Sequence, residues 1–565
     1  MITHADVAMA EFVIDESSII KTIAGGINTD RRGRKPKTES LRLLLVGMFL
    51  SINKRRSATI TDIHRTLTEE IPYDEQFRLG SRTNLKGVIS TIQMTDLYYQ
   101  ANKISERLSY GSRSNPNLSI KERSRRHDVI TSASNALMDV FDFGWKSSTW
   151  AIDATGIWSW AKGGKKHGND IEELQQAIAS GLDTEELIKL LPADAYGYTN
   201  SCDPDAKWGL KTSKSGKVEP VFGYEEHTGV LVPDRKTIKV TDKDGKVRIS
   251  HELVEPPIIR RLELAPATLD VVGVTLRLID SVTDTPLDII VDRHYSYKDF
   301  DDWLSELHKR KIRQHLDLRA DDQGFIEFDR MPWAAGCAHC PGTPRELGEI
   351  PMPALNAPKE TFVAFAGDIA LREAYKMRIV NQPDATGAMR VQCPARAGTV
   401  GCPLRPGTVE VAMIAGLPIV ADPPVKDPNG EPLPRVCTQT TFKTRPPKKI
   451  RKLMQFLYWG SRAWRAMYAR RTYVEGCYGN RKNGSTENLR RGFFRSVGLP
   501  WANLTVSMSA ASYNARMIQN WHARTGKGDP ENPIIKAMDR PGSWMYLEED
   551  EMARIQSVYE IKVDG

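Results

Sequence analysis

Residues 468–482 read YARRTYVEGCYGNRK and space four side chains, Tyr468, Arg471, Glu475 and Lys482, as Tyr-x2-Arg-x3-Glu-x6-Lys. At about 100° per residue, the first three lie within about 60° of one another on a helix. Lys482 would join them if the helix ran that far, and the face would then carry one carboxylate beside two cations and a phenol. A carboxylate suits a divalent metal ion, and the cations and the phenol suit a phosphate next to it.

Two alternatives apply to this stretch. Charged residues at such spacings commonly form an ion-paired surface helix with no ligand. Gly476 and Gly479 also weaken the helix beyond Glu475, so a loop is a second way for Lys482 to reach the same face. Composition alone would place this quartet around a given Glu well under about one time in a hundred, which favours a functional motif.

The spacing resembles the signature of bacterial insertion-sequence transposases of the DDE class, in the cut-and-paste branch with a Tyr-Arg-Glu-Lys motif. In that family the Glu is the third catalytic carboxylate of an RNase H-like domain. The resemblance implies a DNA transposase that binds the terminal inverted repeats of its element and catalyses metal-dependent strand cleavage and strand transfer. It also requires two aspartates upstream, each near the end of a buried strand.

Both aspartates have candidates. Asp153 lies in SSTWAIDATGIW, an apolar-rich stretch typical of a strand, and Asp292 follows the apolar run 287–291. Parallel strands deliver such side chains to the carboxyl edge of a sheet, where ligands bind in open α/β folds. An Asp after a strand is also commonly a turn former or helix cap. The competing acids nearby are Asp203, Asp205, Asp284 and Asp288.

The order of expected elements agrees with an RNase H-like domain. Strands joined by Gly- and Ser-containing turns follow Asp153, a helix is expected over 267–282, and a last strand over 312–319. We predict an α/β fold with an RNase H-like mixed sheet flanked by helices, formed by residues 145–320 and 441–525. Residues 526–565 form a C-terminal tail. The sequence around Glu225 departs slightly from the family, which usually has a basic residue there.

Charge is concentrated around Glu475. The formal net charge is +8, and residues 443–495 contain fifteen Lys or Arg against two acids, Glu475 and Glu487, so the rest of the chain is net acidic. A cationic stripe that encloses one acid is what a phosphodiester channel needs, and DNA contact is the favoured interpretation over a solvated basic face.

Residues 1–140 are expected to form a basic, helical DNA-binding region. Arg32, Arg34 and Lys35 belong to a basic cluster that loosely resembles a minor-groove AT-hook, and a flexible basic linker is the alternative. Residues 58–71 have the Thr-containing start and spacing of a helix, and residues 112–128 are expected to be a hinge into the catalytic domain.

Residues 321–440 are too long for a connecting loop and contain five of the seven cysteines. The resemblance implies a mostly β insertion domain at this place. Cys337 and Cys340 have the spacing of a structural zinc knuckle, and Cys393 and Cys402 could complete a four-thiolate site. Cys437 and His339 are rival ligands. Reduced thiols with no metal are the alternative.

The resemblance assigns Asp153, Asp292 and Glu475 to two Mg²⁺ ions, for which Mn²⁺ can substitute, and assigns Arg471, Lys482 and Tyr468 to DNA phosphates. It implies double-stranded DNA as partner, both transposon ends and target, and a homodimer in the active complex. The first residues lack a basic start and the apolar run at 41–52 is short, so we expect no membrane association and a bacterial cytoplasmic, nucleoid-associated location. A metal-dependent nuclease or recombinase on the same fold and a domesticated DNA-binding regulator remain alternatives.

Overall fold

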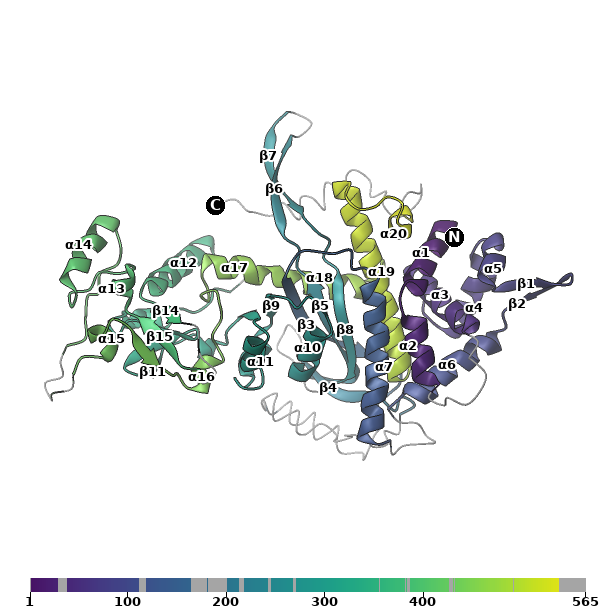
Figure 1. Cartoon of the computed structure of the whole chain (residues 1–565), viewed down its shortest axis with the longest axis horizontal. Coiled ribbons are helices and arrows are strands. Elements are labelled where there is room, and N and C mark those ends of the chain that lie inside the picture. The colour runs from purple at the N-terminus through teal and green to yellow at the C-terminus, as the bar shows by residue number, and fades with distance from the viewer. Residues whose placement is uncertain are drawn as a thin grey trace.

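A curled mixed sheet of six strands forms the centre of the computed structural model (Figure 1). Its strands are β3 (Thr149–Trp158), β4 (Lys207–Thr212), β5 (Val218–Leu231), β8 (Ile259–Pro266), β9 (Asp288–Val291) and β10 (Arg313–Leu316). β3, β9 and β10 run parallel in the order β10-β9-β3, and β5 pairs antiparallel with β3. β4 and β8 share the other edge of the long β5. The predicted α/β class with a mixed sheet flanked by helices is confirmed.

The structure describes most of the chain, and every structural statement here concerns that part: residues 2–28, 38–110, 118–163, 180, 201–212, 218–241, 245–267, 271–354, 356–381, 383, 387–425, 430, 432–490 and 492–537.

The central strands form where apolar residues run together. Ala151 and Ile152 in β3 and Ile289–Val291 in β9 are fully buried. Burial on both faces explains why these strands are continuous apolar runs, as is usual for parallel strands covered by helices. α10 (Val271–Asp280) packs on β5 and β8, and α11 (Leu304–Lys309) leads into β10. The expected helix over 267–282 and strand over 312–319 therefore form, with shorter bounds.

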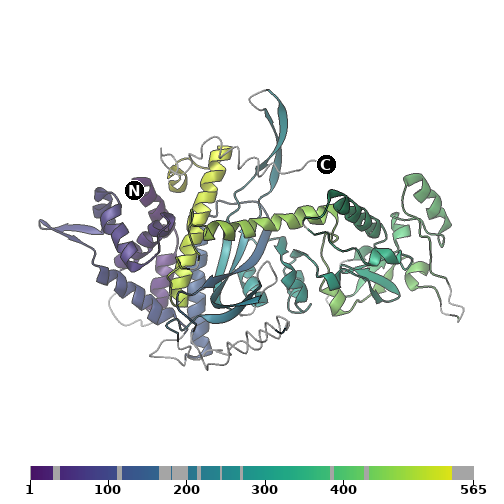
Figure 2. The same cartoon turned by 180° about the vertical axis from the view of Figure 1, so that it is seen from behind.

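Helices cover the sheet on the side of β8. α7 (Ile120–Asp139) and α19 (Leu499–Thr525) both contact β8 and each other, and they cross the sheet side by side in Figures 1 and 2. Ser119 caps α7 by accepting a hydrogen bond from the Glu122 N–H. The expectation of a hinge over 112–128 is wrong for its described part, because the capped helix begins at Ile120.

The N-terminal region is helical, as predicted, with one added β-hairpin. Thr59 caps the helix expected over 58–71, which continues as a π-helical turn at Thr66–Glu70. The helices are α1 (His4–Asp15), α2 (Ile19–Ile27), α3 (Glu39–Asn53), α4 (Ile60–Arg65), α5 (Tyr73–Leu79) and α6 (Met94–Leu108), and the hairpin strands are β1 (Arg82–Leu85) and β2 (Val88–Thr91). α3 contains the apolar run 41–52 and packs against α1 and α19.

The segment between β10 and α16 (Lys448–Arg451) forms a lobe at the left of Figure 1. The expectation that it is mostly β is wrong. α12 (Lys359–Ala374) has 16 residues and α14 (Pro406–Ala415) has 10, whereas the strands have two to four each. Those strands are β11 (Ile326–Phe328), β12 (Met331–Ala334), β13 (Cys337–Ala338), β14 (Arg378–Asn381), β15 (Met389–Gln392) and, just beyond residue 440, β16 (Phe442–Thr444), with short helices α13 (Pro394–Ala397) and α15 (Arg435–Thr438) between them.

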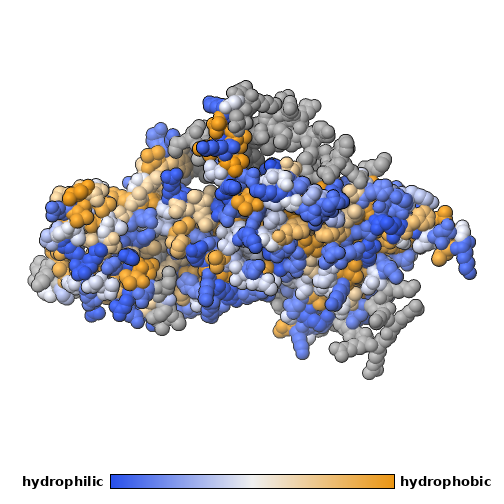
Figure 3. Space-filling model, turned by 45° about the horizontal axis from the view of Figure 1, so that its top comes forward, coloured by the Kyte–Doolittle hydropathy of each residue, from blue (hydrophilic) through white to orange (hydrophobic). Residues whose placement is uncertain are grey.

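Two features project from the surface. β6 (Arg235–Thr241) and β7 (Val247–Leu253) form a separate antiparallel ribbon that rises from the sheet region at the top of Figure 1. Figure 3 shows a mixed, largely hydrophilic surface, with an apolar patch at the end of the lobe that carries α14. The exposed side chains there are Val411, Met413 and Ile414. None of the described helices combines the length and the apolar character needed to cross a membrane.

A long helical connection returns from the lobe to the sheet (Figure 2). α17 (Arg462–Tyr468), a 3-10 turn at Ala469–Arg471 and α18 (Thr472–Lys482) follow one another without a break. Arg481 anchors α18 because its guanidinium pairs with the Glu226 carboxylate of β5, and both side chains are 1% exposed. Arg481 also donates to the Val506 carbonyl of α19 at 2.9 Å.

Removal of Arg481 should therefore be costly. Arg481→Ala leaves the Glu226 carboxylate buried without its cation, and we expect the free energy of unfolding to fall by about 3–5 kcal/mol. Urea denaturation followed by circular dichroism measures this change. Arg490→Ala, which removes an exposed arginine downstream of α18, should change stability by less than about 0.5 kcal/mol. Equal, small effects of the two substitutions would contradict the anchoring role of Arg481.

Candidate functional site

The two aspartates lie on neighbouring parallel strands at the same level of the sheet. Ala151 of β3 pairs with Ile290 of β9, so Asp153 and Asp292, each two residues further on, occupy equivalent positions. Asp292 follows the last residue of β9 and accepts a hydrogen bond from the His294 N–H at 3.0 Å. The sequence predicted each acid near the end of a buried strand: Asp292 does directly follow β9, whereas Asp153 lies within the ten-residue β3, two residues beyond its last pair with β9.

The third acid comes from α18, which contacts β3 and β5. The Arg471 guanidinium donates to Asp153 Oδ2 at 3.0 Å through Nη1 and pairs with Glu475 through Nη2. Arg471 thus lies between the carboxylates of Asp153 and Glu475. The side chain of Glu475 is 50% exposed and that of Asp153 is 21% exposed, so the site opens on its helical side.

Electrostatic effects tie the acids together. Burial raises the pKa of Asp153 to about 6, Arg471 opposes that rise, and the charges of Asp292 and Glu475 add to it. Burial disfavours the Arg471 cation, but Asp153 and Glu475 raise its pKa above the ordinary value. Three acids and one arginine share this site, and its net negative charge suits a cation.

Lys482 is the last residue of α18, so the helix runs through Gly476 and Gly479 and the alternative of a loop is wrong. Both glycines have open space where a side chain would lie. The Lys482 ammonium donates to Thr155 Oγ1 at 2.6 Å and to the Gly156 carbonyl at 3.1 Å, on β3 just beyond Asp153.

Tyr468 is half-buried and stacks on Trp464, with ring centroids 4.8 Å apart and an interplanar angle of 8°. Burial raises the pKa of Tyr468, with a contribution from Asp317 and Asp292 and an opposing one from Arg471. Its phenol is therefore held as a neutral group close to the acids. The four residues of the motif line one side of the site.

Sequence reasoning missed two supporting contacts. Tyr478 is buried and donates its hydroxyl to the Asp153 carbonyl at 2.6 Å, which fixes α18 against the backbone of β3. Arg293 pairs with Asp317 at 3.0 Å and, like Arg471, opposes the rise in the pKa of Tyr468. The position of Arg293 directly after Asp292 could have indicated that it lies near the site. The residues around Tyr478 in the sequence do not indicate its contact with β3.

The competing aspartates have other partners. Asp288 lies at the start of β9, where Arg313 and His315 pair with it. Asp203 accepts from the Ser159 and Tyr224 hydroxyls, and Asp205 accepts from the Leu499 N–H at 2.8 Å. Asp284 is exposed in the loop before β9. None of these four interacts with Arg471 among the described contacts.

The basic stripe over 443–495 is less uniform than its sequence indicates. Arg451 and Arg481 are buried, and Arg471 is paired with acids. Exposed cations remain on both sides of the site: Lys443, Arg445, Lys448, Lys449, Arg462, Arg490 and Arg495. Arg32, Arg34 and Lys35, the AT-hook-like cluster, lie outside the described residues.

The cysteines are all free thiols, and the structure regroups them. Cys340, Cys393, Cys402 and Cys437 act on one another electrostatically, whereas the charged groups that act on Cys337 are Lys376, Glu373 and Arg372. Cys437, and not Cys337, is thus grouped with Cys340, Cys393 and Cys402, whereas the predicted set contained Cys337. Residues 337–340 are extended, so Cys337 and Cys340 point to opposite faces. His339, the other rival ligand, donates to or accepts from the Tyr458 hydroxyl at 2.9 Å.

Closed groups of ligand atoms are rare in this structure. Within the described ranges, one set of three potential metal ligands has all its ligand atoms within 4.8 Å of one another, namely His4, Asp74 and Glu75. His4 and Asp74 are exposed and form an ordinary ion pair at 2.8 Å. Asp153, Asp292 and Glu475 stand wider apart, with the Arg471 guanidinium between two of them.

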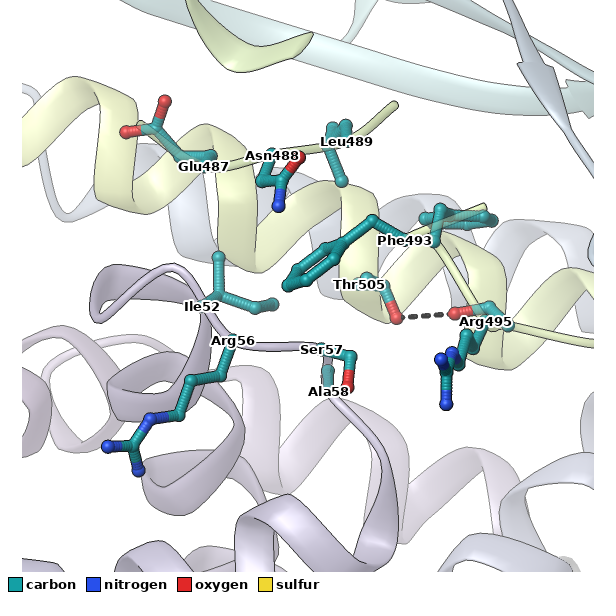
Figure 4. Close-up of a pocket in the computed structure, with 12 residues that line it drawn as sticks. Ile52, Arg56, Ser57, Ala58, Glu487, Asn488, Leu489, Phe493, Arg495 and Thr505 are labelled. Atoms are coloured by element: carbon teal, nitrogen blue, oxygen red, sulfur yellow. Dashed lines mark hydrogen bonds between the residues drawn. The ribbon is translucent and has the colours of Figure 1, made fainter. Parts of the chain in front are cut away.

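A small pocket lies elsewhere, between the turn after α3 and the segment that follows α18 (Figure 4). Its walls include Ile52, Ala58 and Leu489, and the hydroxyls of Ser496 and Thr505 are hydrogen-bonded at 2.8 Å on one side. Arg495 belongs to this pocket and lies 5.3 Å from the Trp160 ring centroid. The pocket is separate from the acidic site.

Comparison of the chain with protein-family models, curated proteins and solved structures found no match.

The raised pKa of Asp153 predicts a pH-dependent stability. The folded chain holds this proton more tightly than the unfolded chain, so Asp153 destabilises the metal-free fold as pH rises from about 4 to about 6. Asp153→Asn cannot ionise and should raise the free energy of unfolding above pH 6 by about 1–3 kcal/mol. Near pH 4 the two proteins should converge. Denaturation in a chelating buffer between pH 4 and pH 8 measures this difference in stability. Asp284→Asn, which changes an exposed aspartate, is the control. A gain in stability of Asp153→Asn that does not depend on pH would contradict the prediction.

Proposed function

We propose that this chain is a DNA transposase of the DDE class, which cleaves and joins strands at the ends of an insertion sequence. The observation that carries the proposal is the meeting of Asp153, Asp292 and Glu475, from two parallel strands and a helix, beside Arg471. Residues far apart in the sequence converge there in the order that the Tyr-Arg-Glu-Lys resemblance requires. An ion-paired surface helix would have no reason to face two aspartates on neighbouring parallel strands.

The order of elements supports an RNase H-like fold. When β4 and the β6–β7 ribbon are set aside, the chain runs β3, β5, β8, α10, β9, α11, β10 and, after the lobe, α18. This is the succession of strands and helices expected of that fold. The parallel trio β3, β9 and β10 delivers Asp153 and Asp292 to one edge of the sheet, where α18 adds Glu475.

The acids suit Mg²⁺ or Mn²⁺. Asp153, Asp292 and Glu475 supply hard carboxylate oxygens, and the repulsion that raises the pKa of Asp153 is the kind that a bound cation relieves. Two such ions, when bound, activate the attacking water or hydroxyl and stabilise the leaving 3′ oxygen. In the metal-free chain Arg471 balances part of this charge, and its guanidinium is then placed to bind a phosphate beside the acids.

The remaining motif residues position the DNA. Lys482 places its ammonium next to β3, two residues beyond Asp153, where a backbone phosphate would pass. Tyr468 offers a neutral phenol for the DNA backbone. Exposed cations on both sides of the site supply the salt-dependent attraction that duplex DNA requires. Because the reaction joins two paired ends, the active complex contains two copies of the chain.

The proposal predicts separate effects on cleavage and on binding. The DNA on both sides of the gene should contain terminal inverted repeats, and a fragment bearing one repeat is the substrate. Asp153→Asn, Asp292→Asn and Glu475→Gln should each reduce single-turnover cleavage with Mg²⁺ by more than about 100-fold, since each removes a metal ligand. Affinity for the end should change by less than about threefold, because distributed cations carry binding. Cleavage without strand transfer would favour the nuclease alternative, and wild-type cleavage by Asp292→Asn would refute the assignment.

A second prediction separates Arg471 from the general basic surface. Arg471→Ala should reduce the cleavage rate by about 100-fold or more with little loss of affinity, because it removes a donor beside the scissile phosphate. Arg471→Lys should rescue only part of the rate, since an ammonium lacks the planar fork of a guanidinium. Arg462→Ala, exposed on α17, should instead weaken binding modestly and reduce its salt dependence by about one charge. Identical, purely affinity-based defects would show that Arg471 is only part of the basic face.

A further inference from the structure

Three of the cysteines in the lobe are followed by proline, and each begins a tight turn. The pairs are Cys340-Pro341, Cys393-Pro394 and Cys402-Pro403. The turns close through backbone hydrogen bonds to the cysteine carbonyls, from the Thr343 N–H at 2.9 Å, the Ala397 N–H at 3.0 Å and the Arg405 N–H at 2.8 Å. A repeated Cys-Pro turn is a specific local structure, and buried thiols without a ligand do not require it.

Backbone contacts bring these turns together with Cys437. Arg405, which closes the Cys402 turn, donates through Nη2 to the Cys437 carbonyl at 2.7 Å. The Cys402 segment also pairs with Val420, whose N–H donates to the Gly401 carbonyl at 2.9 Å. A Cβ added at Gly342, in the Cys340 turn, would lie 2.5 Å from Val420 Cγ1, so this turn packs directly against the same residue.

Backbone N–H groups point at two of the sulfur atoms. Those of Leu404 and Arg405 hydrogen-bond the Cys402 thiol, and that of Gly342 hydrogen-bonds the Cys340 thiol. N–H groups aimed at sulfur are what a metal-bound thiolate needs from its surroundings.

We propose that Cys340, Cys393, Cys402 and Cys437 bind one structural Zn²⁺ ion that holds the lobe together. Four sulfurs from four separated segments match the closed tetrahedral set of a structural zinc site. Arg405 and Arg330 lie near Cys437 and offset the negative charge of a tetrathiolate. In the described chain no three of these sulfurs lie within 4.8 Å of one another, so binding draws the thiols inward.

This site is independent of the proposed DNA chemistry. Its ligands are soft sulfurs, which select Zn²⁺ over Mg²⁺, whereas the acidic site offers only oxygens. The ligands come from turns and segment ends of the lobe, whose strands have two to four residues each. In small units of this kind, metal binding often supplies part of the free energy of folding.

Metal analysis of the full chain, purified without chelators, tests the proposal. We expect about one zinc per chain in the wild type. Cys340→Ser and Cys437→Ser should each lose most of the zinc, whereas Cys337→Ser should retain it. Cys337 is the matched control, because it lies three residues from Cys340 but faces Lys376 and Glu373. A loss of zinc in Cys337→Ser equal to that in Cys437→Ser would overturn this set of ligands.

A second measurement keeps the test decisive if the serine variants fail to fold. Stripped wild-type protein titrated with Co²⁺ should develop the intense charge-transfer and visible bands of a tetrathiolate site, and Zn²⁺ should remove them in a one-to-one ratio. No zinc in the purified protein together with no Co²⁺ spectrum would refute the proposal. A brown protein that contains iron would show an iron–sulfur cluster instead, and would refute it equally.

Discussion

The ion pair between Arg481 and Glu226 is the contact on which the candidate site depends. It joins the end of α18 to β5 in a fully buried environment, and the Tyr478 hydroxyl adds a bond from the same helix to the Asp153 carbonyl. α18 reaches the sheet only after the whole lobe has intervened in the chain. This anchor helps to fix the position of Glu475 relative to Asp153. The three acids therefore come together only when α18 packs against the sheet.

Arg471 gives the site its second property, a balance of charge that differs between metal-free and ligand-bound states. Its guanidinium lies between Asp153 and Glu475, so the acids are held apart by a cation that belongs to the protein. Divalent ions would compete for the same carboxylates, and a released guanidinium is then free to bind a phosphate. Under the proposed function, Arg471, on the same helical face as Glu475, would couple metal binding to DNA positioning.

Local signals predicted much of this arrangement. Apolar runs predicted strands β3 and β9, because a buried strand needs hydrophobic residues; Asp292 follows the end of β9, whereas β3 continues past Asp153 to Trp158. Contacts between residues far apart in the sequence could not be predicted from such local patterns. Glu226 and Arg481 are 255 residues apart, and nothing near either residue identifies its partner. Likewise, the Cys337/Cys340 spacing suggested a knuckle, but the extended backbone turns Cys337 to the other face, and Cys437 joins only through the fold. The mostly β lobe that the resemblance implied was also wrong, since α12 follows Pro358 and α14 begins at Pro406, and proline suits the start of a helix.

The central claim is that Asp153, Asp292 and Glu475 together bind divalent metal ions. Iron-directed cleavage tests it most directly: Fe²⁺ bound in place of Mg²⁺, with ascorbate and peroxide, generates radicals that cut the nearby backbone. The account predicts cuts close to residues 153, 292 and 475, suppressed by excess Mg²⁺ and absent in Asp153→Asn. Cuts confined to the neighbourhood of His4, Asp74 and Glu75, or no Mg²⁺-sensitive cuts near the three acids, would contradict it.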